Sequence, residues 1–210
     1  MKKFILLFMF ILVSGTVFAQ EEETIFGNNN YSFGGFGAAV TQFSGVDDEF
    51  AFMSGIRGGV IINHSVTIGL GSYNFTNQVK HANYVDPVSN KKPFLEMNYF
   101  GLEFEYTWEP LSALHFSVQS LVGSGWTGYR LNSTFDSHDD HYDPDYGNDW
   151  FFVATPQISM EVNVTNWMRI STGVGYRVVY GADYHFNNET INDQKLSRPF
   201  GALTFKFGKF

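Results

Sequence analysis

The sequence contains no cysteine, so no disulfide framework supports the fold, and stability must come from strand pairing and burial. Beyond its first twenty residues it has no apolar run of the roughly 20 residues that a membrane-spanning helix needs. Basic residues are also few: 13 Lys and Arg against 21 Asp and Glu give a formal charge of −8, which argues against nucleic-acid binding. Aromatic residues (18%) and glycines (21) are abundant instead, a composition that favours strands over helices.

The first 19 residues have the pattern of a secretory signal peptide. Lys2 and Lys3 supply the positive region, Phe4–Val13 is an unbroken apolar stretch, and Val17-Phe18-Ala19 offers a cleavage site before Gln20. The apolar stretch is too short for a retained helical anchor. We therefore divide the chain into a signal peptide at 1–19, a short extension at 20–30 and one barrel domain at 31–210.

The segment Tyr99–Trp108 alternates apolar and polar residues. Its even positions are apolar or aromatic, and its odd positions carry small or charged groups, including Glu103 and Glu105. A strand with this period has one apolar face and one polar face. Because an exported chain without a covering layer must bury the apolar face elsewhere, we expect it to face lipid.

Eight such stretches are present. We predict strands at 31–43, 50–62, 66–76, 95–108, 113–130, 150–164, 167–180 and 198–210. Short connectors at 63–65, 109–112 and 165–166 alternate with the connectors at 44–49, 77–94, 131–149 and 181–197, of which the last three are long and polar. Outer-membrane barrels place short turns in the periplasm and long loops outside. The pattern predicts an all-β, eight-stranded antiparallel up-and-down transmembrane barrel; the structural alternative is a soluble exported barrel.

The tryptophans fit this orientation. Trp108 and Trp167 lie at the short-turn ends of their strands, and Trp126 and Trp150 lie toward the long-loop ends. Rings with a polar edge prefer the headgroup level, so two membrane-interface belts are expected. We also expect four tyrosines in the outer belt: Tyr73, Tyr99, Tyr129 and Tyr180.

The last strand ends in Phe210, after Leu203, Phe205 and Phe207 on one face. This resembles the C-terminal strand of outer-membrane proteins, whose terminal aromatic is the signal read by the assembly machinery. Phe210 is out of phase with the other three residues, which predicts either a bulge or an imperfect signal. Pro156 inside a predicted strand likewise predicts a bulge.

Together these features resemble the small eight-stranded outer-membrane barrels of the OmpA transmembrane-domain and OmpX type, over about Tyr31 to Phe210. The segment Gly55–Ser65 also resembles an uncharacterised outer membrane beta-barrel family of Bacteroidetes-type bacteria. The resemblance implies a cell-envelope protein of the Gram-negative outer membrane, in contact with lipid and lipopolysaccharide.

The polar parity assigns charged residues to the barrel interior: Arg57, Glu103, Glu105, Glu161, Arg169, Arg177 and Lys206. An eight-stranded barrel is just wide enough for side chains to fill, and buried charges need partners. We predict a charge network that closes the lumen; the alternative is a narrow ion path. We expect eight glycines to face inward and make room: Gly35, Gly37, Gly69, Gly71, Gly123, Gly125, Gly173 and Gly175.

Two candidate chemistries remain. His115 and Ser117 resemble the His-x-Ser pair of outer-membrane lipid A deacylases, with Glu103 or Glu105 as the orienting acid. Their place after a periplasmic turn, facing the lumen, argues against lipid cleavage. The loop 131–149 has no Lys or Arg, and its acidic and histidine side chains offer ligands for Ca²⁺ or Zn²⁺; the alternative is a solvated loop. The candidate ligands are Asp136, His138, Asp139, Asp140, His141, Asp143 and Asp145.

The sequence predicts a non-enzymatic outer-membrane barrel with no resident cofactor. Its expected role is structural support of the envelope or surface interaction through the loops 77–94, 131–149 and 181–197, because binding concentrates on loops carried by a rigid scaffold. The alternatives are a small porin-like channel and a lipid A-modifying enzyme. The sequence does not identify an extracellular partner.

Overall fold

A computed structural model describes residues 31–46, 49–77, 79–80, 84–131, 146–187 and 189–210. The predicted signal peptide and extension, 1–30, lie outside them. The barrel wall consists of β1 (Phe33–Val46), β2 (Glu49–Ile62), β3 (Val66–Phe75), β5 (Phe94–Trp108), β6 (Leu114–Arg130), β7 (Asn148–Ala154), β8 (Gln157–Thr165), β9 (Met168–Tyr176), β10 (Val178–Tyr180) and β13 (Pro199–Lys209). Smaller elements are β4 (Val79–Lys80), β11 (Asp183–Phe186), β12 (Glu189–Asn192) and α2 (Asp193–Leu196).

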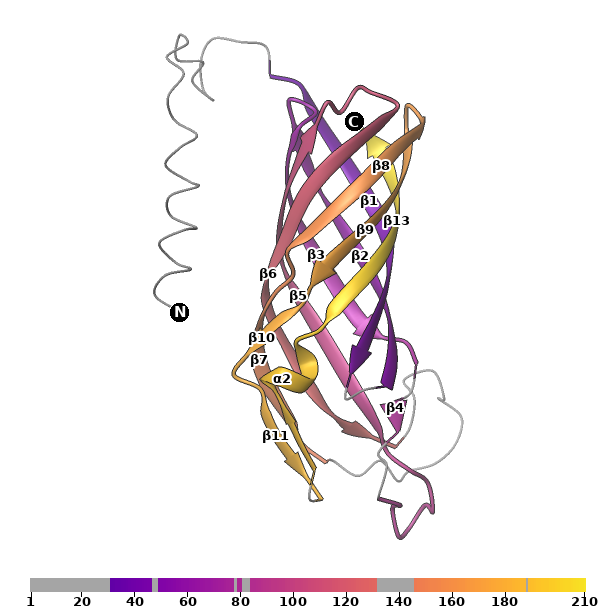
Figure 1. The fold of residues 1–210 in the computed structure, drawn as a ribbon, viewed down its shortest axis with the longest axis vertical. Helices are drawn as coiled ribbons and strands as arrows, with labels where there is room; N and C mark the ends of the chain where they lie inside the picture. The colour runs from indigo at the N-terminus through magenta and orange to yellow at the C-terminus, as the bar shows by residue number, and fades with distance from the viewer. Residues whose placement is uncertain (1–30, 47–48, 78, 81–83, 132–145, 188) are drawn as a thin grey trace. The chain divides into compact units, whose positions relative to one another are not determined.

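The strands close into one antiparallel barrel (Figure 1). Successive wall positions pair with each other around the ring. The ring is completed by β1, which pairs with both β2 and β13, from Gly35 opposite Lys209 to Ser44 opposite Phe200 in the second case. β7 and β8 follow each other along β6 and together make one of the eight strands of the wall. β9 and β10 together make the next strand. The predicted eight-stranded up-and-down barrel is confirmed.

The predicted bulge at Pro156 is wrong. Ala154 lies opposite Val122 and Gln157 lies opposite Gln119, so the register with β6 is the same on both sides of the proline. The Pro156 carbonyl accepts a hydrogen bond from Tyr176 N at 3.0 Å, but proline cannot donate one in return. The loss of a single ladder bond interrupts the strand without inserting a residue. A register shift is present further on, between Asn163 and Thr165.

The turns differ at the two ends of the barrel. In the 63–65 turn both Asn63 (φ 50°) and His64 (φ 61°) are left-handed, the conformation that a tight hairpin of matching twist requires. The three short turns lie at the end that holds the C-terminus, and the longer connections lie at the opposite end (Figure 1). This is the predicted alternation of turns and loops.

One predicted loop, 181–197, contains regular structure. β11 and β12 form a hairpin, and α2 follows with Asn192 as its N-cap, whose side chain accepts a hydrogen bond from Lys195 N at 3.1 Å. Leu196 at the end of α2 is fully buried in the apolar cluster of the barrel interior. The segment therefore covers the loop end of the lumen.

The outer surface of the barrel is apolar. On β5 the side chains of Phe100, Leu102 and Phe104 are each about half exposed, as the even-position parity predicts. Ten residues of β6 lead from Phe116, the partner of Trp108, to Trp126. At about 3.3 Å per residue and a tilt of about 40°, the two tryptophan levels are about 25 Å apart, the height of the apolar band of membrane barrels. Among the described residues, no helix is long and apolar enough to cross a membrane.

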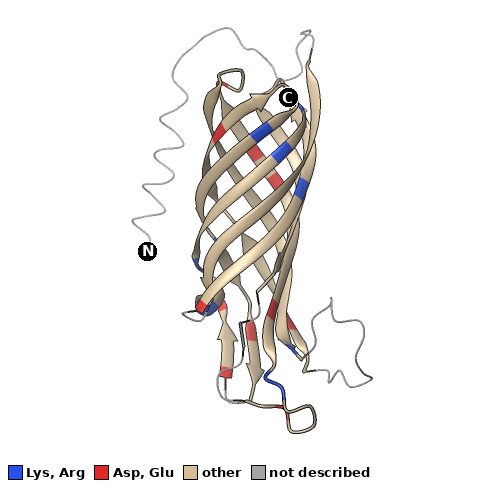
Figure 2. Cartoon of the chain, turned by 90° about the vertical axis from the view of Figure 1, so that its right-hand side faces the viewer, with Lys and Arg blue, Asp and Glu red and all other residues tan. Residues whose placement is uncertain are grey.

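The interior has two layers. Nearer the short turns it holds charged side chains; several blue and red positions mark the strands in the upper half of the barrel in Figure 2. Nearer the loops it is filled by an apolar cluster, which includes Val40, Met53, Tyr73, Leu95, Met97, Tyr99, Leu121, Phe151, Val179, Leu196 and Phe200. The polar face predicted for the interior is thus polar over only part of its length.

Candidate functional site in the barrel interior

Arg57 on β2 forms one half of the interior charge network. Its Nε lies 3.2 Å from Glu103 Oε2, and its Nη2 pairs with Glu105 Oε2. Tyr73 Oη donates a hydrogen bond of 2.8 Å to Glu103 Oε1. These side chains come from β2, β3 and β5, whose register places Arg57 and Glu103 close together across the inner wall.

Lys206 on β13 joins this half to a second one. Its Nζ lies 2.7 Å from Glu105 Oε1 and 2.8 Å from Glu161 Oε2. Glu161 on β8 also receives Arg169 Nη1 at 3.1 Å and His115 Nε2 at 2.9 Å. The result is a continuous chain of contacts from Glu103 to Arg169 that crosses the lumen from one wall to another.

The network is balanced in formal charge, with three carboxylates and the three cations Arg57, Arg169 and Lys206. Each of these six side chains is at most 5% exposed. A buried charge is strongly unfavourable unless it is paired, and removing one partner of a buried pair costs about 3–5 kcal/mol. The mutual pairing therefore makes the charges tolerable inside the wall, and it ties β2, β5, β8, β9 and β13 together.

Glycines leave room for these side chains. A Cβ at Gly71 would lie 2.4 Å from Glu103 Oε1, and one at Gly173 would lie 2.4 Å from Ser159 Oγ, so neither position accepts a side chain without displacement. The inward prediction is wrong for Gly35 and Gly37. On β1 the buried residues Phe36, Ala38 and Val40 have the opposite parity, which turns both glycines to the outer surface.

His115 is held by two oxygen atoms. Its Nδ1 lies 3.0 Å from Ser112 O, and its Nε2 lies 2.9 Å from Glu161 Oε1, so each ring nitrogen already contacts an oxygen atom. Ser117 is buried two residues further along the strand, and neither nitrogen of His115 is free to activate it. The arrangement serves the network and is unsuited to a serine nucleophile.

Aromatic rings cover the network on the side of the short turns. The Phe36 ring centroid lies 5.4 Å from the Arg57 guanidinium and 5.2 Å from Lys206 Nζ. The Arg169 guanidinium lies 4.0 Å from the centroid of Phe210. The pairing of β13 with β1 runs unbroken to Lys209, so no bulge rotates Phe210 outward, and its ring packs against the small apolar cluster of Phe36, Ala38 and Ile61. Its role as an assembly signal stays a prediction.

Arg177, which we predicted in the same network, lies in the other layer. It is fully buried; its Nε donates to Leu196 O at 2.8 Å and its Nη1 lies 3.0 Å from Met53 Sδ. Among the described residues it forms no ion pair with a carboxylate. Its backbone exchanges hydrogen bonds with Arg198 at the last turn before β13. Strand parity correctly predicted that Arg177 points inward, but its height in the barrel separates it from the carboxylates.

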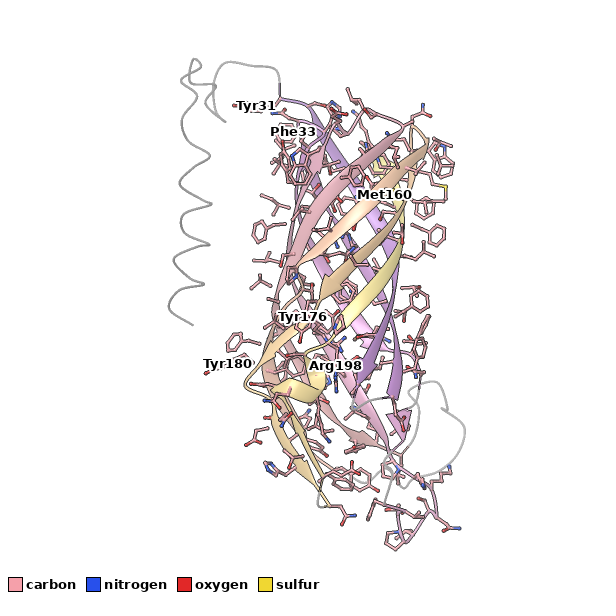
Figure 3. The ribbon with its side chains drawn as sticks, viewed as in Figure 1. Tyr31, Phe33, Met160, Tyr176, Tyr180 and Arg198 are labelled. Atoms are coloured by element: carbon pink, nitrogen blue, oxygen red, sulfur yellow. The ribbon has the colours of Figure 1, made fainter. Side chains whose placement is uncertain are left out.

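The aromatic belts are only partly as expected. Trp108, Trp150 and Trp167 are each about half exposed on the outer surface, and Trp126 packs against Trp150 with ring centroids 5.4 Å apart. Of the four tyrosines only Tyr180 is exposed, projecting from the wall in Figure 3. Tyr73, Tyr99 and Tyr129 are buried, because they have the parity of the inner face; Tyr73 and Tyr99 stack at 5.0 Å.

The candidate metal ligands, from Asp136 to Asp145, lie outside the described residues. Among the residues that the structure does describe, no group of three His, Cys, Asp or Glu side chains is placed to hold a metal ion.

Comparison with known proteins identifies the fold. No protein-family model matches the chain, and no curated protein matches it in sequence. Among solved structures, the chain is similar to Neisserial surface protein A (NspA), with a TM-score of 0.52, 12% identity and coverage of 87% of this chain and 100% of NspA. The chain has the fold of a small outer-membrane β-barrel.

Two further solved barrels are similar at lower scores. Ail, the attachment invasion locus protein of Yersinia pestis, has a TM-score of 0.46 and 8% identity, covering 84% of this chain and 96% of Ail. OprG from Pseudomonas aeruginosa has a TM-score of 0.43 and 11% identity, covering 84% of this chain and 94% of OprG. At these identities the likeness concerns the fold alone.

The apolar outer wall with its two tryptophan levels, together with this fold, places the barrel in the outer membrane. Because outer-membrane barrels place short turns in the periplasm and long loops outside, we infer that the short turns and the charge network lie toward the periplasm and the 181–197 segment toward the outside.

Proposed function

We propose that this outer-membrane barrel is closed and non-enzymatic, and that it acts in the envelope or at the cell surface through its extracellular segments. The observation that carries the proposal is the continuous chain of ion pairs from Glu103 to Arg169 through Lys206. Above this chain the apolar cluster fills the next layer of the lumen. A solute entering the barrel meets two consecutive obstructions.

The loop end supports a role in surface interaction. Five aromatic side chains join three loops into what we call the extracellular cap: Tyr84, Tyr129, Tyr146, Tyr184 and Phe186. Tyr146 Oη donates to Asp86 Oδ2 at 2.8 Å, and Tyr184 Oη donates to Tyr146 O at 2.8 Å. A cap held in one arrangement loses little conformational entropy when a partner binds.

The non-enzymatic part of the proposal is supported by the placement of His115 and Ser117. Both are buried in the lumen near the periplasmic turns, and the ring nitrogens of His115 are occupied. A lipid substrate has no access to them from the outer leaflet.

Liposome swelling tests the closed lumen. We expect vesicles that contain the purified barrel to swell in arabinose no faster than empty vesicles. Swelling at a rate proportional to the amount of barrel would support the porin-like alternative and overturn the proposal.

Replacing residues 183–192 by a Gly-Ser linker tests the extracellular part. We expect the variant barrel to reach the outer membrane, because the wall strands are intact, and cells that carry it to lose adherence to coated surfaces. The matched control is Lys209→Ser, a change at the periplasmic end. Equal adherence of cells carrying the wild type, the linker variant and no barrel would contradict a role in surface interaction.

A further inference from the structure

The outer wall carries a groove of about 450 Å³ across β2, β3 and β5. Its sides are formed by large apolar side chains, Ile56 (71% exposed), Leu70 (64%) and Phe100 (48%). The small residues Gly58 and Ser72 form its depression. All five have the outward parity of their strands, so the groove opens on the lipid-facing surface and not into the lumen.

The strand register produces this shape. Ser72 lies between Ile56 and Phe100 in one row of cross-strand partners, and Gly58 lies beside Leu70 in the next row toward the periplasm. The partner of Gly58 on β1 is Gly37, where an added Cβ would meet no atom within 4 Å. No side chain of β1 therefore stands against the groove at Gly58, and the groove lies along the wall.

On the side of the loops, the groove ends at a row of polar residues, which lies at the extracellular interface of the membrane. Asn74 follows Ser72 by two residues on the same face of β3, and its cross-strand partner is Asn98. Asn98 is in turn the partner of Trp126 in the outer tryptophan level. Asn74 and Asn98 thus stand where a lipid headgroup meets the hydrocarbon region.

A cation lies beyond this row. Arg130 is about half exposed, and its Nε lies 2.7 Å from Glu96 Oε2, two residues from Asn98 along β5. Among the described residues, Glu96 is the one carboxylate paired with Arg130, and the remaining N–H groups of the guanidinium are suited to a phosphate.

We propose that this groove binds one acyl chain of a lipid A-type phosphorylated glycolipid of the outer leaflet, with its headgroup beside Asn74 and Asn98 and its phosphate at Arg130. Lipid tails are as apolar as the wall, so the hydrophobic effect does not select this site. Dispersion attraction selects it instead, because an acyl chain bound in the groove makes contacts with Ile56, Leu70 and Phe100 that an empty groove lacks. The groove lies next to the outer tryptophan level, so the lipid that reaches it comes from the outer leaflet.

The test uses Ser72→Leu, which fills the depression. The matched control is Ser124→Leu: Ser124 is the other cross-strand partner of Phe100, at the same height and on the same face but outside the groove. Both changes add an apolar side chain to a lipid-facing position, so neither should impair folding, which heat-modifiable migration on gels verifies.

Native mass spectrometry of the purified barrel, titrated with lipid A in detergent, gives the readout. We expect a one-lipid adduct whose affinity falls about tenfold in Ser72→Leu, the factor that loss of roughly ten carbon–carbon contacts gives, and is unchanged in Ser124→Leu. Arg130→Gln should weaken lipid A binding as well. Equal adducts in the wild type and in Ser72→Leu would overturn the site. Equal binding of phosphatidylethanolamine and lipid A, insensitive to Arg130→Gln, would overturn the assignment to a phosphorylated glycolipid.

Discussion

Lys206 Nζ lies 2.7 Å from Glu105 Oε1 and 2.8 Å from Glu161 Oε2, so one lysine joins two buried carboxylates from different walls of the barrel. Lys206 stands at the seam where the last strand meets the first, and its contacts connect that seam to β5 and β8. The lysine that links the two halves of the charge network therefore stands on the strand that completes the ring.

Lys206→Met should destabilise the barrel by about 3–5 kcal/mol, because it leaves Glu105 and Glu161 buried with fewer opposite charges. Urea-induced unfolding in lipid vesicles measures the change. Lys209→Met is the control, since Lys209 is exposed on the same strand. If both variants unfold at the urea concentration of the wild type, the network contributes nothing to stability.

Gly71→Ala should destabilise the barrel by about 1–3 kcal/mol, the usual effect of overpacking. The new methyl group would lie 2.4 Å from Glu103 Oε1, so Glu103 would have to move from Tyr73 and Arg57. Gly37→Ala is the matched control, because its Cβ points into open space. The same unfolding experiment compares them, and a Gly71→Ala barrel as stable as the Gly37→Ala barrel would show that the space beside Glu103 is not needed.

Arg177→Met should loosen the segment that covers the loop end without weakening the wall. The change removes the hydrogen bond to Leu196 O, while the apolar surroundings accept methionine. We expect the Ser197 amide, which donates to Asp193 O, to exchange its hydrogen about fivefold faster, in line with one lost hydrogen bond. Amides of β1 serve as the internal control and should not change. An unchanged rate at Ser197 would rule out this anchoring role.

Asp86 should make the order of the 84–91 turn dependent on pH. Burial opposes ionisation, but hydrogen bonds from Ser89, Tyr146 and the Val88 amide outweigh it and lower the pKa of Asp86 from 3.8 to about 2. Because the pKa in the folded state lies below its ordinary value, the stabilisation is fully present above pH 4 and is lost as the pH falls through about 2.

Hydrogen exchange of the Val88 and Ser89 amides between pH 2 and pH 5 checks this prediction. After correction for intrinsic exchange, protection in the wild type should fall with pH. In Asp86→Asn it should be low and independent of pH. Asp183→Asn, a change at an exposed carboxylate, should behave as the wild type. A wild-type profile without pH dependence would contradict the assignment.

Much of the wall could be predicted from the sequence because a strand encodes its two faces at a period of two residues. Turn lengths added the alternation of short and long connections. The same parity also contained a signal that the tyrosine prediction did not use: Tyr99 is in phase with Glu103 and Glu105, and it is buried beside them on the inner face. The belt prediction used only the position of the tyrosines near the long-loop end. The alternation of inward and outward residues is the stronger signal for which face a side chain takes.

The prediction of the charge network used parity and left out height in the barrel. Arg169 follows the predicted turn at 165–166 by three residues and Arg177 follows it by eleven, so the two side chains lie at different heights. For this reason Arg177 was grouped with carboxylates that lie in the other layer. The phase of β1 was misassigned for a related reason, because glycines such as Gly37 carry no side chain that marks a face. The burial of Leu196 depends on the whole apolar cluster and has no short-range signal.

The electrical conductance of the purified barrel in planar lipid bilayers tests the closed lumen most directly. We expect no unitary current steps for the wild type at any applied voltage, because in our proposal the chain from Glu103 through Lys206 to Arg169 and the apolar cluster above it fill the lumen. Reproducible single-channel steps from the wild-type protein would contradict it.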